Sequence, residues 1–190
     1  MTTFITVAVI AALLAVIIIA IYNGIITRLN AVERAWANVI TQERQKNKII
    51  PALEQLTEKY QLYEAGVMTQ ITELRSALHS LSADNVDTAG LAQAEQKTTN
   101  LIKGLQVAVE NYPELKASET FNNLMREISN QQENIGAAIR IFNQNVEDFN
   151  NGIETFPNSL VNQQFNRKQK IQTFTDSEAE QGFEYSLKKQ

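Results

Sequence analysis

The sequence contains few residues of the kinds that carry out catalysis or bind metals. Its only histidine is His79, and the absence of cysteine excludes disulfides and thiolate zinc sites. Metal sites in helical bundles use several His and Glu side chains three or four residues apart, but Ser76 and Arg75 stand at those spacings before His79. No P-loop, dinucleotide-binding glycine motif or G-x-S-x-G motif is present. We therefore expect no cofactor, no metal site and no enzymatic activity, and a solvated or capping role for His79.

Two amides lie beside an apolar stripe in residues 140–157, RIFNQNVEDFNNGIETFP. The stripe has the spacing of one helical face, with steps of three and four residues: Phe142, Val146, Phe149, Ile153 and Phe156. Asn143 and Asn150 stand next to it, one heptad apart. In a seam between helices, such a polar residue gives up stability and fixes register or partner choice. We interpret both asparagines as register pins bonded to a facing amide, carbonyl or charge; the alternative is a half-solvated place at the flank of the stripe.

Two charged residues repeat the heptad spacing on the same predicted helix, Glu133 and Arg140. A lone buried charge costs several kcal/mol, so these side chains must be paired if they are buried. Their spacing follows the apolar stripe, which favours the buried arrangement over a wet flank. Trp36, nearer the N-terminus, is expected as a core or interface anchor rather than as a stacking platform.

The first element of the chain is apolar throughout. Residues 4–21, FITVAVIAALLAVIIIAI, include one polar side chain and no charge, and as a helix they would rise about 27 Å, close to the thickness of a bilayer's hydrocarbon core. Tyr22 is the amphipathic ring expected at an interface. A cleaved signal peptide is the alternative, but MTTF has no charged side chain and Ala20-Ile21-Tyr22 is a poor cleavage site. We expect an uncleaved transmembrane anchor over residues 1–27.

The charges around this span favour one orientation. No Lys or Arg precedes it, whereas Arg28, Arg34 and Arg44 follow it, so the positive-inside rule places the N-terminus outside and the bundle in the cytoplasm. The net charge is −4, and no clustered basic face indicates a nucleic-acid partner. The small basic cluster NRKQK, residues 166–170, fits a solvated loop better than a lipid-headgroup site.

Helical periodicity continues from the span into the rest of the chain. The apolar stripe runs from Leu29 to Leu81 with no break after the membrane segment, so one helix is expected to pass from bilayer to domain. Pro51 should kink or restart this helix around residues 47–50, and Gly66 is a second candidate break.

Capping residues divide the remaining chain. A connection over residues 82–90 offers Asp87 or Thr88 as the N-cap of a second helix, over roughly 88–111. Ser118 caps a third helix over about 119–155, which Pro157 ends. The predicted fold is therefore all-α: a transmembrane helix continuing into an elongated antiparallel bundle of the four-helix type, with three long helices over residues 28–157 and a docked C-terminal segment and tail over residues 158–190.

Five stretches of the sequence resemble one protein family. They are YN (residues 22–23), RLNAVERAWANV (28–39), IIPALEQLTEKYQLYE (49–64), ENYPELKA (110–117) and ENIGAAIRIFNQNVEDFNNGIETFP (133–157). Together they are similar to the LemA family of bacterial membrane-anchored helical proteins, over nearly the whole chain. Two departures stand out: Gln45, Lys46 and Ala52 replace an Arg-rich stretch and an Asn usual in the family, and Phe142 and Phe149 replace tyrosines.

The resemblance implies a four-helix bundle anchored in the membrane by its N-terminal helix, with no established enzymatic activity. Family members often lie near genes for membrane proteases or other envelope proteins. We therefore expect a non-enzymatic, homo-oligomeric scaffold in the bacterial inner membrane that contacts the lipid bilayer and other copies of itself. The alternative is an adaptor or regulatory subunit that binds another envelope protein, such as a protease or sensor. Pro51, Trp36 and the two pairs of polar residues are the expected structural residues.

Overall fold

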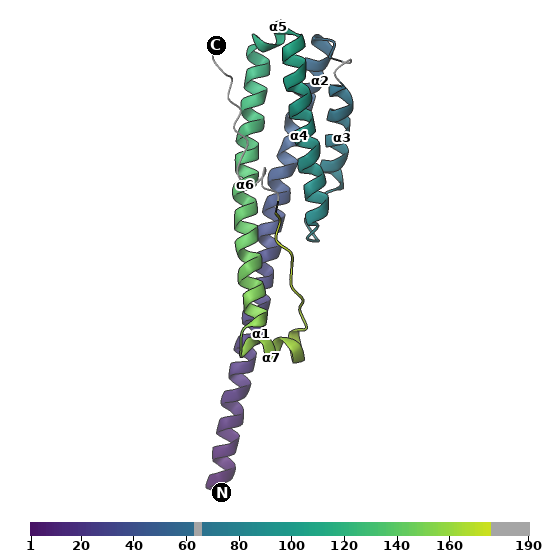
Figure 1. The fold of residues 1–190 in the computed structure, drawn as a ribbon. Helices are drawn as coiled ribbons and strands as arrows, with labels where there is room; N and C mark the ends of the chain where they lie inside the picture. Colours follow the sequence, from purple (N-terminus) through teal and green to yellow (C-terminus); the bar gives the residue numbers. More distant parts are fainter. Residues whose placement is uncertain (63–65, 176–190) are drawn as a thin grey trace.

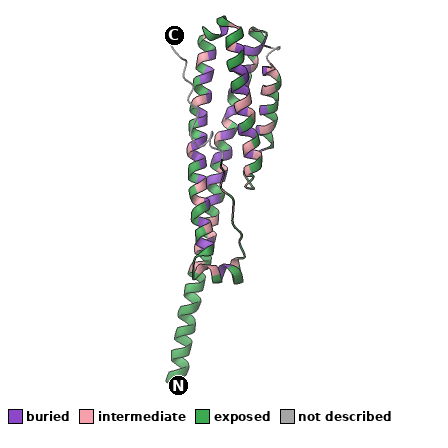
Figure 2. Ribbon diagram, viewed as in Figure 1, coloured by how far each residue is buried: buried purple, intermediate pink, exposed green. Residues whose placement is uncertain are grey.

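A computed structural model describes residues 1–62 and 66–175 of the chain as an elongated all-α bundle (Figure 1). Helix α1, Thr2–Gln45, is continuous; its N-terminal part projects alone from the bundle and its C-terminal part packs within it. The projecting part is exposed along its whole length (Figure 2). The predicted passage of one helix from the apolar segment into the domain is confirmed.

The predicted break before Pro51 is also confirmed. After α1 the chain forms a 3₁₀ turn, η1, Lys46–Lys48, and then a new helix, α2, Ile50–Lys59. Pro51 lies in the first turn of α2, where its missing N–H would have no partner within the helix. The chain therefore bends slightly while keeping its general direction (Figure 1).

The chain reverses after α2. Helix α3, Val67–Ser80, runs back beside α2, and Gly66 precedes it with a φ of +68°, a conformation that suits glycine. The apolar stripe that is continuous in the sequence is thus divided among α1, α2 and α3, of which α3 runs antiparallel to the other two (Figure 1). Glu64 of the IIPALEQLTEKYQLYE stretch lies outside the described residues, as do residues 176–190 of the predicted C-terminal segment and tail.

The two remaining long helices begin at the predicted caps. Helix α4, Thr88–Asn111, starts where the Asp87 carboxylate accepts a hydrogen bond from the Gly90 N–H at 2.9 Å. A single turn, α5, Pro113–Lys116, leads to α6, Glu119–Glu154, whose first turn is capped by the Ser118 hydroxyl. After Pro157 come a short helix, α7, Asn158–Val161, and a π-helical turn, η2, Asn162–Asn166.

The bundle has two parts, which differ in the segments that surround the core. Far from the N-terminus, α2, α3, α4 and α6 surround the core, as in a four-helix bundle (Figure 1). Nearer the N-terminus, only α1 and α6 remain, and the extended chain after η2 returns beside them. This returning segment, residues 167–175, takes the place that α3 and α4 occupy in the other part. Buried residues follow the inner faces of the helices in both parts (Figure 2).

Candidate functional site

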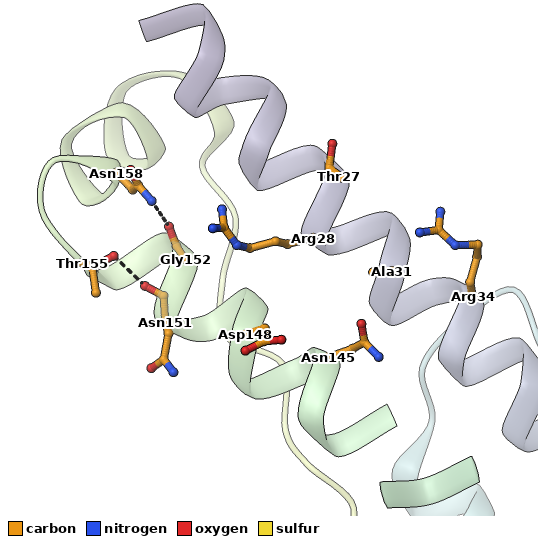
Figure 3. A pocket seen from close by; sticks show the side chains of 10 residues that line it. All are labelled: Thr27, Arg28, Ala31, Arg34, Asn145, Asp148, Asn151, Gly152, Thr155 and Asn158. Carbon is orange, nitrogen blue, oxygen red and sulfur yellow. Dashed lines mark hydrogen bonds between the residues drawn. The ribbon is translucent and has the colours of Figure 1, made fainter. Parts of the chain in front are cut away.

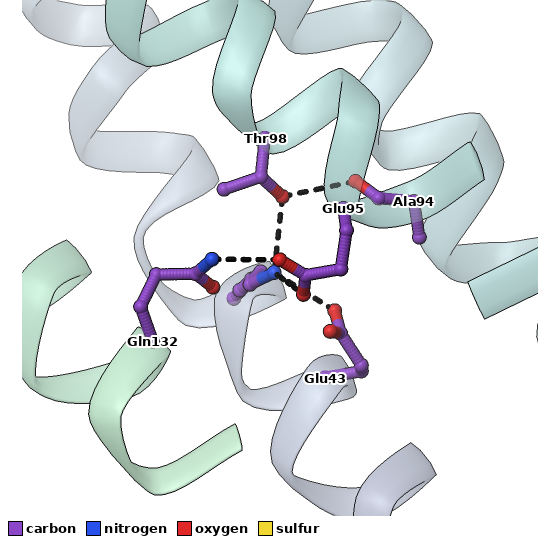
Figure 4. A network of polar contacts seen from close by, with 6 residues as sticks. Glu43, Ala94, Glu95, Thr98 and Gln132 are labelled. Carbon is purple, nitrogen blue, oxygen red and sulfur yellow. Dashed lines mark hydrogen bonds and ion pairs between the residues drawn. The ribbon is translucent and has the colours of Figure 1, made fainter. Parts of the chain in front are cut away.

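A group of buried polar side chains joins the helices in the middle of the bundle (Figure 4). The Lys46 ammonium donates to Glu95 Oε1 at 2.8 Å and to the Thr98 hydroxyl at 3.0 Å. Its Nζ also lies 2.9 Å from Glu43 Oε2. Gln132 of α6 donates to the second oxygen of Glu95 at 2.7 Å. These five residues, called the buried network below, link α1, η1, α4 and α6.

Burial and mutual attraction set the charges of the buried network. Burial works to lower the pKa of Lys46, but the carboxyl groups of Glu43 and Glu95 raise it above its usual value. Burial raises the pKa of Glu43 well above its usual value, and repulsion from Glu95 adds to the rise. Burial works to raise the pKa of Glu95 as well, but attraction to Lys46 and its hydrogen bonds lower it to about 2. Of the two carboxyl groups, Glu95 therefore gives up its proton more readily, and Glu43 keeps its proton to higher pH.

The buried network has a signal in the sequence, although it matches none of the motifs of catalytic or metal sites. Glu43 and Lys46 continue the apolar stripe of α1 at steps of four and three after Val39, although they stand in the polar stretch TQERQKNK. Glu95 holds the same phase in α4, four residues after Leu91. A charged residue in phase with an apolar stripe faces the core and needs a partner there.

The two predicted register pins hold the returning segment. Asn143 donates to the carbonyl of Phe174 at 2.7 Å and accepts from its N–H at 2.8 Å. Asn150 does the same with Ile171, at 2.9 Å and 3.0 Å. Each amide therefore satisfies both backbone groups of one residue. The groups facing these half-buried asparagines belong to an extended backbone, not to another helix.

Glu133 and Arg140 do not occupy buried positions, so that expectation was wrong. Both side chains are exposed on α6. At about 100° per residue, they point about 150° away from the centre of the buried stripe, whereas Asn143 and Asn150 point about 70° away. The shared heptad spacing places each pair on a line along the helix, but these are different lines, and only one borders the core.

Trp36 is a core residue. Its indole ring is 1% exposed and packs against Phe142 of α6, with ring centroids 5.3 Å apart and planes at 55°. Its Nε1–H donates to the carbonyl of Ser82 in the connection between α3 and α4, at 3.0 Å. Trp36 thus fixes that connection to the first helix and offers no open face to a ligand.

A groove of about 520 Å³ lies between α1 and α6 near the point where α1 leaves the bundle (Figure 3). Arg28 and Arg34 line it from α1, and Asp148 lines it from α6. Gly152 lets the Arg28 side chain pass close to α6, because a Cβ there would lie 2.7 Å from Arg28 Cδ. The groove is polar and open. Its lining includes no histidine, cysteine or pair of carboxylates that could act as nucleophile and base.

These features define a class of protein: an elongated helical bundle, internally braced by polar contacts, with an unburied apolar helix projecting from one end. The chain belongs to the LemA family, whose family model matches residues 35–184. It is also similar to a protein named Protein LemA from Metamycoplasma hominis, with 26% identity over 141 residues. That alignment covers 74% of this chain, and the chain spans 63% of the relative's length.

The N-terminal part of α1 is long and apolar enough to cross a membrane, and no residue in its most apolar 18-residue window is buried. A signal sequence near an N-terminus shares the same length and composition. The bundle itself begins at Ile25, the first buried residue of α1.

Proposed function

We propose that this LemA-family protein is a non-enzymatic, single-pass scaffold of the bacterial inner membrane, anchored by α1 and assembled from several copies of the chain. The observation that carries the proposal is the continuity of α1. Its apolar, unburied part and its bundle part form one helix with no hinge between them. A bundle fixed in this way keeps a defined position relative to the bilayer, which suits a structural component.

The use of polar residues supports a structural role over a catalytic one. Lys46, Glu43 and Glu95 are almost completely buried and bond to one another. Asn143 and Asn150 bond to the backbone of the returning segment. These polar groups therefore hold the bundle together, and a substrate could not reach the buried network without opening it.

The proposed orientation has the N-terminus outside and the bundle in the cytoplasm. It is supported by Arg28 and Arg34, which follow the apolar segment, and by the lack of Lys and Arg before it. A protease added to the outside of sealed cells should leave the bundle intact, and should digest it only after the membrane is opened.

The test is the mass of the native particle. Full-length protein is solubilised gently from its own membrane and compared with a variant that begins at Arg28. A large, uniform assembly containing only this chain is expected, and the shortened variant shows whether the span is required for it. A small particle carrying a second protein at fixed ratio would support the adaptor function instead, and a lone monomer would contradict both.

A further inference from the structure

Three large apolar side chains are exposed within residues 156–165, at the end of the bundle from which α1 projects (Figure 1). Phe156 is 80% exposed, Leu160 58% and Phe165 55%. Among the described residues after Tyr22, the other large apolar side chains with comparable exposure are Val107 and Ile141, on α4 and α6. We call Phe156, Leu160 and Phe165 the apolar foot. Such a cluster on a protein surface marks a contact with another molecule or with a membrane.

Local structure turns these side chains outward. Phe156 lies in the turn before α7, and Leu160 and Phe165 are five residues apart across the π turn. The Arg167 N–H bonds to the Asn162 carbonyl, the five-residue step of a π-helix, so this spacing is close to one turn. Val161 and Asn162 lie between them and are buried. The segment therefore has two sides, with Leu160 and Phe165 exposed and with Val161 and Asn162 facing the bundle.

The apolar foot lies beside the emerging end of the projecting helix. Asn166, next to Phe165, donates to the Tyr22 carbonyl of α1 at 3.4 Å. Tyr22 directly follows the apolar residues 4–21, and α7 crosses α1 at this height (Figure 1). A bilayer that surrounds residues 4–21 would bring its interfacial layer to α7.

Positive charges accompany the apolar foot. Arg167 and Lys168 follow the π turn directly and are exposed. The Asn162 amide fixes Lys168 by donating to its carbonyl and accepting from its N–H, both at 3.0 Å. Arg28 lies six residues after Tyr22, about 9 Å further along α1, in the groove beside α7 (Figure 3). Headgroup layers extend about 5–8 Å beyond the hydrocarbon core on each side, so these cations lie near the depth of lipid phosphates.

We propose that α7 and the π turn form a second, interfacial membrane contact. Phe156, Leu160 and Phe165 insert at the boundary between headgroups and acyl chains, and Arg167 and Lys168 face anionic headgroups. This inference rests on the proposed membrane anchor, because the foot meets the bilayer only if α1 spans it. With two contacts on the same membrane surface, the bundle keeps a fixed tilt relative to the bilayer, which attachment through α1 alone would not fix.

The test uses single-cysteine variants of the full chain, which has no native cysteine. Leu160→Cys, Phe165→Cys, Leu14→Cys in the span and Val107→Cys on α4 each carry an environment-sensitive nitrobenzoxadiazole label. Each variant is reconstituted in phosphatidylethanolamine–phosphatidylglycerol vesicles. The vesicles contain lipids with a nitroxide at a shallow or a deep position in the bilayer, and the nitroxide quenches the fluorescence of a nearby label. We expect the labels at 160 and 165 to be quenched several-fold more than that at 107, mainly by the shallow lipid, and the label at 14 mainly by the deep lipid.

The outcomes separate this inference from the anchor on which it rests. If the label at 14 is quenched but those at 160 and 165 behave like that at 107, the anchor stands and the interfacial contact is wrong. If the labels at 160 and 165 show apolar emission without lipid quenching, a protein surface covers the foot, and the inference is again wrong. If the label at 14 is not quenched, the proposed anchor itself fails. Gln163→Cys, an exposed position in the π turn, repeats the test without removing an apolar residue.

Discussion

The side-chain amide of Asn150 hydrogen-bonds both backbone groups of Ile171, and this pairing repeats once, between Asn143 and Phe174. Seven residues of helix rise about 10 Å, and three residues of extended chain also cover about 10 Å. The heptad spacing of the two asparagines therefore matches three residues of an antiparallel extended segment. This match explains why amides, which can both donate and accept, stand one heptad apart beside the core.

Replacing Asn143 with Asp should loosen the returning segment without unfolding the helices. The carboxylate still accepts from the Phe174 N–H, but it cannot donate to the Phe174 carbonyl. A hydrogen bond lost at a partly buried site costs on the order of 1 kcal/mol. Hydrogen exchange should become faster at Ile171 and Phe174 and remain unchanged at core positions of α6.

The matched control is Asn151→Asp, an exposed asparagine on the same helix whose side chain faces the polar groove. It makes the same change of charge and helix propensity without touching the returning segment. Equal exchange at Phe174 in both variants would show that Asn143 does not hold this segment.

Replacing Lys46 with Met should destabilise the whole bundle. The change leaves the Glu95 carboxylate buried without its cation, a loss of about 3–5 kcal/mol in comparable buried pairs. Lys48→Met is the control, because Lys48 lies in the same 3₁₀ turn and is exposed. Denaturant unfolding followed by helical circular dichroism measures both. Similar midpoints for the two variants would contradict the structural role of the buried network.

A variant that replaces Glu43, Lys46 and Glu95 together by Leu, Met and Leu should recover much of the stability lost in Lys46→Met. The reason is that apolar residues of similar size avoid the desolvation of the charges, and comparable replacements are often neutral or stabilising. The unfolding free energy of this triple variant is compared with that of the single variant. A triple variant less stable than Lys46→Met would mean that the carboxyl groups stabilise the bundle through contacts other than those with Lys46.

Helix limits could be predicted from the sequence because they depend on local chemistry. Asp87 and Ser118 cap the helices that follow them, and Pro51 opens α2. The buried positions of Glu43 and Lys46 could also have been predicted, since both residues share the phase of the apolar stripe. The pairing of Lys46 with Glu95 could not have been predicted, because the distance between α1 and α4 depends on the packing of the whole bundle.

A docked C-terminal segment was predicted, but the extended course of the returning segment could not be, for a different reason. Its apolar residues have no regular spacing, and the backbone groups of Ile171 and Phe174 bond to side chains 21 and 31 residues earlier in the chain. Two exposed residues, Glu133 and Arg140, share the heptad spacing that marks the two asparagines. Spacing alone therefore identified a line of residues on α6 but not the side of the helix on which that line lies.

Substitutions at Trp36 measure how much its contacts, which join the connection between α3 and α4 to α1, contribute to stability. Trp36→Ala removes a fully buried ring and should cost about 3–5 kcal/mol of unfolding free energy. Trp36→Phe keeps an aromatic ring against Phe142 but loses the donor to the Ser82 carbonyl, so it should cost less and should speed hydrogen exchange around Ser82. Unfolding curves and exchange rates measure the two effects separately. A Phe variant as unstable as the Ala variant would place the main contribution in ring volume or in the indole hydrogen bond, not in aromatic packing.

The buried network predicts opposite pH responses for its two carboxyl groups. The pKa of Glu95 is lowered in the folded state to about 2, so its contribution to stability is present above the unfolded pKa, about 4.3, and is lost as the pH falls towards 2. The pKa of Glu43 is raised, so the folded state retains a proton that the unfolded state releases above about 4.3. Stability from Glu43 is therefore fully present below that pH and declines as the pH rises through its folded pKa.

Two isosteric variants separate these responses. Glu43→Gln mimics the protonated carboxyl and should be tolerated, and its stability relative to the unchanged protein should improve as the pH rises from 4.5 to 7. Glu95→Gln removes the charge that pairs with Lys46 and should be strongly destabilising at pH 7, with the difference shrinking as the pH falls towards 2. Urea unfolding across this range measures both differences. If Glu43→Gln is the more damaging variant at pH 7, then Glu43 carries the negative charge and Glu95 the proton, and the assignment of the two carboxyl groups is reversed.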